Sequence, residues 1–244
     1  MKILWINPIG TNIFDDEIYS RLLKIKYPES DIEVVSLRKG KPLHLEYHSY
    51  EALVAPDIIR IVRNASNKGF DAAIIGCFYD TAIRESREIS RHMVIVGPCQ
   101  SSLSIAANLG NTFSVLVGRK KWIPRIKENI ILYGQEHKLA SIRALNLSVD
   151  DIDRKRNVTF ERMVFEGRLA IEQDGAEVLV LGCTAAIDYA ESLQHELNVP
   201  VVDSFVIPFK YAEMLASLVS KFDLYPSRIF GSEPPPPEEL DLFI

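Results

Sequence analysis

The chain has 244 residues, enough to bury a large core as one α/β domain or as two smaller ones. Its composition, 47% hydrophobic and 25% charged with a formal net charge of −5, is ordinary for a globular protein and argues against a nucleic-acid or anionic-membrane partner. No apolar run approaches the ~20 residues of a membrane span, and the N-terminal apolar stretch is too brief for a secretory signal. We therefore expect a cytoplasmic protein.

Short apolar runs rich in β-branched residues alternate with amphipathic stretches of helical length, the pattern of a parallel sheet covered on both faces. In the first half this pattern predicts strands at 2–6, 32–35, 72–75 and 94–96, and helices at 15–25, 55–67 and 81–91. In the second half it predicts strands at 113–117, 141–145, 178–181 and 201–202, and helices at 123–133, 158–173 and 185–197. The shared order indicates an α/β fold made by duplication of a βαβαβαβ module.

A Gly-Cys pair follows the third strand of each half, in AAIIGCF (72–78) and in VLVLGCT (178–184). Ligands of open parallel sheets bind beyond the carboxyl ends of the strands, so we expect Cys77 and Cys183 to line one cleft. The residues after each cysteine are expected to form the first turn of the next helix, with Asp80 as a cap. The N–H groups of that turn would lower the pKa of the thiol and stabilise an oxyanion.

Two thiols on opposite sides of a planar group can remove a proton from a carbon beside a carbonyl and return one to the other face. Their reference pKa of roughly 8.5 allows one thiolate and one thiol to coexist near neutrality. A single cysteine at a strand end is more often inert packing, and the matched pair favours catalysis by Cys77 and Cys183. Cys99 has no counterpart in the second half and is interpreted as structural or pocket-lining.

Other candidates for substrate binding are expected at the same strand ends. Asn7 and Pro8 follow the first strand, and Gly118 follows its counterpart. The Asn7 amide either reaches a substrate carbonyl or organises the turn. Asp203 either meets a substrate amide or caps the last helix, and Thr184 either touches substrate or caps its own helix.

Several other chemistries lack their motifs. The chain contains no Gly-x-Gly-x-x-Gly, no Walker A sequence and no Gly-x-Ser-x-Gly, which argues against a dinucleotide, a phosphate-loop ATPase and a serine hydrolase. Three cysteines do not make a disulfide framework. His44 and His48 stand four apart, but without a third ligand we interpret them as part of a polar loop or helix face and predict no metal.

The chain resembles the aspartate/glutamate/hydantoin racemase superfamily, and most closely its hydantoin and allantoin racemase branch, from residue 1 to about 218. The resemblance is carried by INP (6–8), GCFYD (76–80), RE (84–85), IVGPCQSSLSIAANLGNTFSVLV (95–117), GAEVLVLGCT (175–184) and VPVVDS (199–204). It implies two similar doubly wound lobes related by a pseudo-twofold axis, with the active site between them. It further implies a homo-oligomeric racemase that needs no cofactor, in which Cys77 serves one face of a small-molecule substrate and Cys183 the other.

The sequence departs from that branch beside both cysteines. Hydantoin and allantoin racemases commonly carry Cys-Phe-Gly-Asp-Pro-Gly, whereas Tyr79 replaces the first of those glycines here and is expected to reshape the pocket. The usual Gly-Glu-Ala and Gly-Cys-Ala-Gly sequences are also changed. The residues of these segments that we expect to bind substrate are Phe78, Tyr79, Gln100, Ser101 and Thr184. The substrate is therefore hydantoin, allantoin, an amino-acid-like compound or a different molecule.

The resemblance implies a first lobe formed by residues 1–98 and 205–226, where a helix near 210–221 returns to it, and a second lobe formed by residues 99–204. Residues 227–244 form a Pro-rich tail, either disordered or docked on a neighbouring subunit. Two other functions stay open. One is a decarboxylase or cis-trans isomerase of the same superfamily, and the other is a non-catalytic two-lobed small-molecule binding protein.

Overall fold

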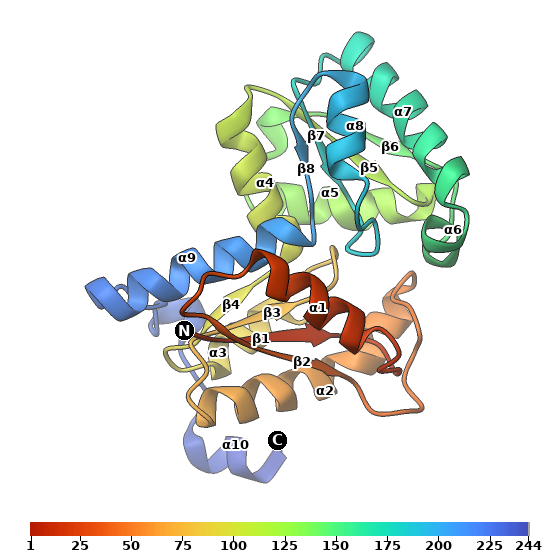
Figure 1. Cartoon of the computed structure of the whole chain (residues 1–244). Coiled ribbons are helices and arrows are strands. Elements are labelled where there is room, and N and C mark those ends of the chain that lie inside the picture. Colours follow the sequence, from red (N-terminus) through yellow and green to blue (C-terminus); the bar gives the residue numbers. More distant parts are fainter. Residues whose placement is uncertain (244) are drawn as a thin grey trace. The chain divides into compact units, whose positions relative to one another are not determined.

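The strands of the computed structural model, which describes residues 1–243, form two separate four-stranded parallel sheets (Figure 1). The first sheet has the order β2-β1-β3-β4, with β1 (Lys2–Asn7), β2 (Asp31–Ser36), β3 (Ala72–Ile75) and β4 (Val94–Val96). The second has the equivalent order β6-β5-β7-β8, with β5 (Phe113–Val117), β6 (Leu139–Ala144), β7 (Val178–Leu181) and β8 (Val201–Val202). The α/β class and the repeated strand order are confirmed.

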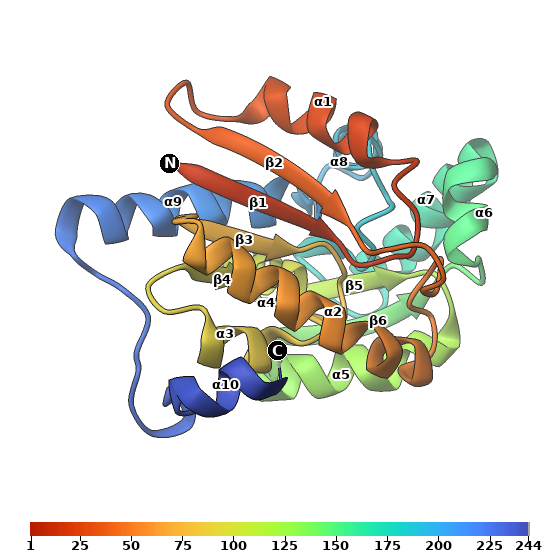
Figure 2. The same cartoon turned by 90° about the horizontal axis from the view of Figure 1, so that it is seen from below.

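Helices cover both faces of each sheet, as right-handed parallel crossovers require. On the first sheet, α1 (Asp15–Ile25) and α9 (Val206–Phe222) cover one face, and α2 (His48–Asn67) and α3 (Ile83–Ile89) cover the other (Figure 1 and Figure 2). The second sheet is covered by α4 (Pro98–Leu109), α5 (Ile123–Leu132), α6 (Val149–Arg154), α7 (Arg156–Glu172) and α8 (Ala190–Leu197). The central strands β3, β5 and β7 are buried along their whole length, which explains their mainly apolar sequences. The polar exception is Ser114 of β5, whose hydroxyl forms a hydrogen bond with that of Ser141 at 2.8 Å.

Several helix bounds differ from the predictions. Helix α2 begins at His48 and runs through Pro56, and neither α4 nor α6 was predicted. Helices α3 and α8 begin later than predicted, at Ile83 and Ala190, because the residues after each cysteine form turns instead. In α4 the many serine and alanine residues weaken the amphipathic pattern that identifies a helix.

The chain divides into two compact units that are interleaved in sequence. The first contains Met1–Gly76, Thr81–Gly97 and the chain from Pro208 onward, and the second contains Cys77–Asp80 and Pro98–Ile207. The four residues Cys77–Asp80 therefore leave the first unit and pack within the second. The lobe bounds expected from the sequence place these four residues in the first lobe, so this excursion is a feature that the sequence did not indicate.

The segment after α9 contacts the first unit. It contains a short 3-10 helix at Phe230–Ser232 and then α10 (Pro237–Phe243) (Figure 2). Arg63 of α2 donates from Nη1 to the carbonyl of Leu240 at 3.0 Å and forms an ion pair with Asp241. The expectation of a disordered tail stays untested, and Ile244 lies outside the described residues. Docking of this segment on a neighbouring subunit stays a prediction.

Candidate active site

The two Gly-Cys pairs occupy equivalent places in the two sheets. The N–H of Gly76 donates to the carbonyl of Ile6 on β1, and the N–H of Gly182 donates to the carbonyl of Leu116 on β5, both at 2.8 Å. Each bond continues the parallel ladder one residue past the third strand of its sheet. Each cysteine is therefore the first residue beyond the ladder, at the carboxyl end of a central strand.

The glycine of each pair is required by packing. A Cβ at Gly76 would lie 2.7 Å from Nε1 of Trp5, and a Cβ at Gly182 would lie 2.9 Å from the carbonyl oxygen of Leu116. Neither glycine has a left-handed backbone, so its role is to leave space rather than to turn the chain. The neighbouring strands thus set the identity of the residue before each thiol.

A tight turn follows each cysteine. The carbonyl of Cys77 accepts from the N–H of Asp80 at 2.9 Å, and the carbonyl of Cys183 accepts from the N–H of Ala186 at 3.0 Å. The prediction that these residues form the first turn of a helix is wrong. Left-handed backbones at Asp80 and Ala82, with φ of 54° and 57°, separate the first turn from α3. Helices α3 and α8 therefore begin several residues after the cysteines, at Ile83 and Ala190.

All three cysteines carry thiols, but their surroundings differ. Cys77 and Cys183 are half-buried and pack against the same hydrophobic core, that of the second unit. Cys99 has no exposed surface, and its burial, followed by the negative charge of Asp80, raises the pKa of its thiol well above the usual value. Cys99 is accordingly a neutral thiol in the core, and the two half-buried thiols are the candidates for proton transfer.

Asp80 attaches the turn of Cys77 to the second unit. Its two carboxylate oxygens accept from the N–H groups of Cys99 and Gln100, both at 2.9 Å, in the first turn of α4. The hydroxyl of Tyr133 donates to Oδ2 of the same carboxylate at 2.7 Å. Asp80 is thus a helix cap, as expected, but it caps α4 rather than the helix that follows it in sequence.

Phe78 and Tyr79 are buried in the core of the second unit, with 3% and 7% of their surface exposed. The ring of Tyr79 packs edge-to-face on Trp122, with the ring centroids 6.5 Å apart. Its carbonyl oxygen accepts from Nη2 of Arg125 at 3.0 Å and from Nδ2 of Asn129 at 2.8 Å. The tyrosine in place of the family's glycine therefore fills space inside the unit.

Of the remaining predicted residues, Asn7 lies in the first unit. Its Nδ2 donates to the hydroxyl of Ser36 at 2.9 Å, and that hydroxyl donates to Asp15 at 2.5 Å. This chain of bonds joins the ends of β1 and β2 to the start of α1, so it organises the turn. Pro8 follows Asn7 and is buried.

The others lie in the second unit. A Cβ at Gly118 would lie 2.5 Å from the ring of Trp122, so the residue after β5 packs closely against the 3-10 helix Lys120–Trp122 that precedes α5. Oδ1 of Asp203 accepts from the N–H groups of Phe205 and Val206, at 2.7 and 3.0 Å, and caps α9. Thr184 is half-buried in the turn after Cys183, too far in sequence from α8 to cap it.

Gln100 and Ser101 belong to the first turn of α4. Gln100 is half-buried, whereas Ser101 is 1% exposed and donates from its hydroxyl to the carbonyl of Pro98 at 3.3 Å. The second unit therefore contains both candidate catalytic residues and most of the candidate binding residues. These are Cys77, Phe78, Tyr79, Gln100, Ser101, Gly118, Cys183, Thr184 and Asp203.

Three residues that the sequence did not single out hold this site together. Arg125 and Asn129 are four residues apart on one face of α5, and Tyr133 caps the C-terminus of that helix. Each of the three donates a hydrogen bond to Tyr79 or Asp80. Their spacing is visible in the sequence. Their partners are not, because those partners lie about fifty residues earlier in the chain.

The two histidines that were considered as metal ligands have different surroundings. His44 lies in the loop before α2 and its ring contacts Tyr47 and Tyr50, with centroids 5.9 and 5.3 Å apart. His48 begins α2 and lies 3.4 Å from Glu51. Among residues 1–243 no three His, Cys, Asp or Glu side chains are grouped as metal ligands would be.

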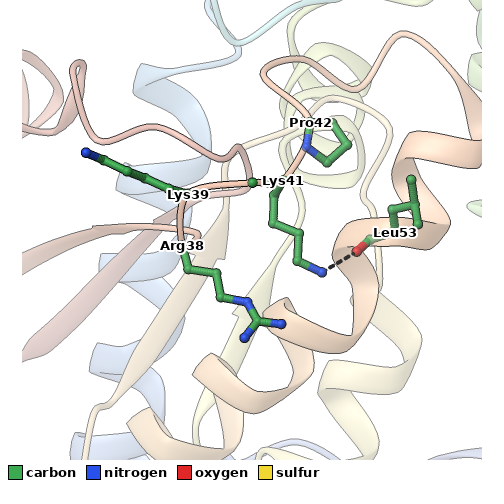
Figure 3. A pocket seen from close by; sticks show the side chains of 6 residues that line it. Arg38, Lys39, Lys41, Pro42 and Leu53 are labelled. Atoms are coloured by element: carbon green, nitrogen blue, oxygen red, sulfur yellow. Dashed lines mark hydrogen bonds between the residues drawn. The ribbon is translucent and has the colours of Figure 1, made fainter.

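A hollow of about 440 Å³ lies in the first unit, between the loop after β2 and α2 (Figure 3). Its lining residues are Arg38, Lys39, Gly40, Lys41, Pro42 and Leu53. Lys41 donates to the carbonyl of Leu53 at 2.9 Å and lies 2.6 Å from the carboxylate of Asp57. This lining has no thiol and no other group that exchanges protons near neutral pH, so it does not replace the cysteine turns as the candidate site.

The comparison with protein families gives one match. The model of the family described as Asp/Glu/Hydantoin racemase matches residues 3–212. A hydantoin racemase of Pseudomonas sp. (strain NS671) is 33% identical to this chain over 225 residues, which cover 91% of this chain and 88% of that one.

Solved structures with the same fold include two allantoin racemases. That of Pseudomonas fluorescens has a TM-score of 0.86 and 26% identity, and the match covers 97% of this chain and 98% of that one. That of Klebsiella pneumoniae has a TM-score of 0.87 and 24% identity, and covers 97% and 94%. Within the described part of our chain, every helix is too short or too polar to span a lipid bilayer.

Proposed function

This chain belongs to the Asp/Glu/hydantoin racemase family and is an isomerase of the racemase class, and we propose that it inverts a ring carbon beside a carbonyl in a cyclic ureide such as hydantoin or allantoin. The reaction uses Cys77 and Cys183 as its acid and base and needs no cofactor. The observation that carries this proposal is the pair of half-buried thiols, each on a matching turn after the third strand of its sheet.

The chemistry follows from the acidity of the substrate carbon. One thiolate removes the proton, the C–H bond breaks, and its electron pair moves onto the neighbouring carbonyl to give a planar enolate. The other cysteine donates its thiol proton to the opposite face, which forms the new C–H bond and inverts the centre. The two cysteines then have exchanged protonation states, and proton exchange with water restores them. Cys99 takes no part because it has no exposed surface that a substrate could reach.

The charges of the candidate residues support an uncharged substrate. A free amino acid carries a carboxylate and an ammonium group, which proteins commonly pair with a cation and an anion. The candidate binding residues include no cation, and their one carboxylate, Asp203, accepts two hydrogen bonds in capping α9. A cyclic ureide instead presents neutral N–H and C=O groups, which amide and hydroxyl side chains can satisfy.

Solvent-deuterium exchange tests the proposal. Each enantiomer of 5-substituted hydantoins and of allantoin is incubated with the enzyme in D₂O, with aspartate and glutamate as further candidates. We expect deuterium at the stereocentre together with inversion for at least one ureide. Cys77→Ser and Cys183→Ser should each abolish inversion, whereas Cys99→Ser should retain it. Full racemisation by either of the first two variants would contradict the two-cysteine mechanism.

The same assay distinguishes the alternative functions. A binding protein would hold a ligand from this panel without exchanging its proton. A decarboxylase would release CO₂ from a substituted malonate and place solvent deuterium on the product. We consider the decarboxylase less well supported, because one proton donor suffices for that reaction and this chain carries two matched thiols.

A further inference from the structure

We propose that Arg125 and Asn129 of α5 and Tyr133, the residue that caps its C-terminus, are positioning residues that fix Cys77 by holding the turn it begins. We call them the α5 donors. This inference rests on the proposed function for its catalytic meaning, but the structural part of it concerns only the turn and one helix. None of the three side chains belongs to the proposed acid/base pair.

The α5 donors contact two successive residues of the turn. Arg125 and Asn129 both donate to the carbonyl of Tyr79, at 3.0 and 2.8 Å, and Arg125 also donates to Oδ1 of Asn129 at 2.5 Å. Tyr133 donates to the carboxylate of Asp80 at 2.7 Å. Asn129 and Asp80 are 2% and 5% exposed, so these bonds are shielded from water.

The turn needs such support for two reasons: Asp80 has a left-handed backbone, and the chain enters the turn from the first unit. The chain reaches Cys77 from β3 of the first unit and returns to that unit at Thr81. Asp80 itself has a φ of 54°, a left-handed conformation that a residue with a side chain adopts only when its surroundings hold it. Its carboxylate is held by three donors, two N–H groups of α4 and the hydroxyl of Tyr133.

The two cysteines differ in how the chain connects them to the second unit. Cys183 follows β7 of the same unit, whereas Cys77 reaches that unit only through its own turn. Loosening the α5 donors should therefore displace Cys77 and leave Cys183 in place. The reactivity of the two thiols toward a small alkylating agent measures this difference directly, with no substrate and no turnover required.

The test compares Tyr133→Phe and Asp80→Asn with wild type. Each protein is treated with iodoacetamide, and the rate of alkylation at each cysteine is measured by peptide mass mapping. Loss of one hydrogen bond corresponds to a change of about 2- to 10-fold, so we expect the ratio of the Cys77 rate to the Cys183 rate to change by that factor. The Cys183 rate should stay near its wild-type value, and kcat should fall while KM changes little.

Tyr189→Phe is the matched control. The hydroxyl of Tyr189 donates to the carbonyl of Ile152, also at 2.7 Å and also inside the second unit, but it does not contact the turn. We expect this variant to keep the wild-type ratio. Alkylation of Cys99, which has no exposed surface, reports general opening of the unit and should stay slow in every variant.

The proposal is overturned if Tyr133→Phe and Asp80→Asn leave the ratio unchanged. It is also overturned if Tyr189→Phe changes the ratio equally, or if Cys99 becomes reactive together with Cys77, because general loosening would then explain the effect. Failure of the proposed function looks different: wild type would racemise none of the tested compounds, while the ratio would still respond to the α5 donors.

Discussion

Replacing Gly182 by alanine should destabilise the second unit. The new Cβ would lie 2.9 Å from three atoms of β5, namely the carbonyl oxygen of Leu116 and one methyl group each of Val115 and Val117. These residues are at most 2% exposed, and none offers a flexible side-chain end that can swing away. Overpacking of a buried site costs about 1–3 kcal/mol, and the lower entropy of the unfolded alanine chain offsets about 0.4–1 kcal/mol. The net loss is therefore about 1–2 kcal/mol.

Thermal unfolding followed by circular dichroism measures this loss. For a chain of this length 1 kcal/mol shifts the melting temperature by roughly 2–4 °C, so Gly182→Ala should melt roughly 2–8 °C below wild type. Gly231→Ala is the control, because no atom lies within 4 Å of its added Cβ and its backbone is not left-handed. Equal melting temperatures for Gly182→Ala and wild type would refute the idea that packing dictates this glycine.

Three further predictions concern groups outside the proposed acid/base pair. Cys99→Ala should keep racemase activity. In urea unfolding it should lose about 1 kcal/mol of stability, which is the cost of deleting one buried group the size of a methyl. Loss of activity would show that Cys99 does more than pack in the core. Lys41→Met should lower the urea midpoint by the equivalent of about 1–2 kcal/mol, because the Asp57 carboxylate, which is 12% exposed, loses its partner at 2.6 Å and keeps the longer ion pair with Arg60 at 3.3 Å. An unchanged midpoint would count against the Lys41–Asp57 ion pair. The hydrogen bonds that Arg143 donates are the main cause of the lowered pKa of Asp174. The Asp174 carboxylate therefore stabilises the folded state above its unfolded pKa of about 4, and this stability is lost as the pH falls through the lower pKa of the folded state. The stability difference between wild type and Arg143→Met should therefore be large at pH 7 and shrink below about pH 4, and a difference that grows on acidification would contradict this assignment.

Local sequence was sufficient to place the strands and to identify the candidate thiols. The runs at 72–75 and 178–181 are apolar throughout, and the run at 113–117 is apolar except for Ser114, because both faces of each sheet are covered. The repeated Gly-Cys pair then marks the same point in both halves. A feature that recurs at the same place in a duplicated module can be recognised without knowing its surroundings.

The helix starts after the cysteines could not be predicted in this way. Thr81 and the residues around it suggest a cap, yet α3 begins only at Ile83, after left-handed residues at Asp80 and Ala82. Those conformations are held by donors from α4 and α5, which lie 19 to 53 residues further along the chain. The residues next to the turn in sequence therefore do not indicate these partners.

The sequence by itself determined two parallel sheets and two matched cysteines, since strand periodicity and motif repetition are local properties of the chain. Only the tertiary structure decided that Cys77 packs with the second unit, that Asp80 caps α4 instead of its own helix, and that Tyr79 fills a core position. The physical reason is that a buried carbonyl and a buried carboxylate must find donors wherever the fold supplies them. Here the donors come from α4 and from α5 with its C-cap, which no local pattern connects to the turn.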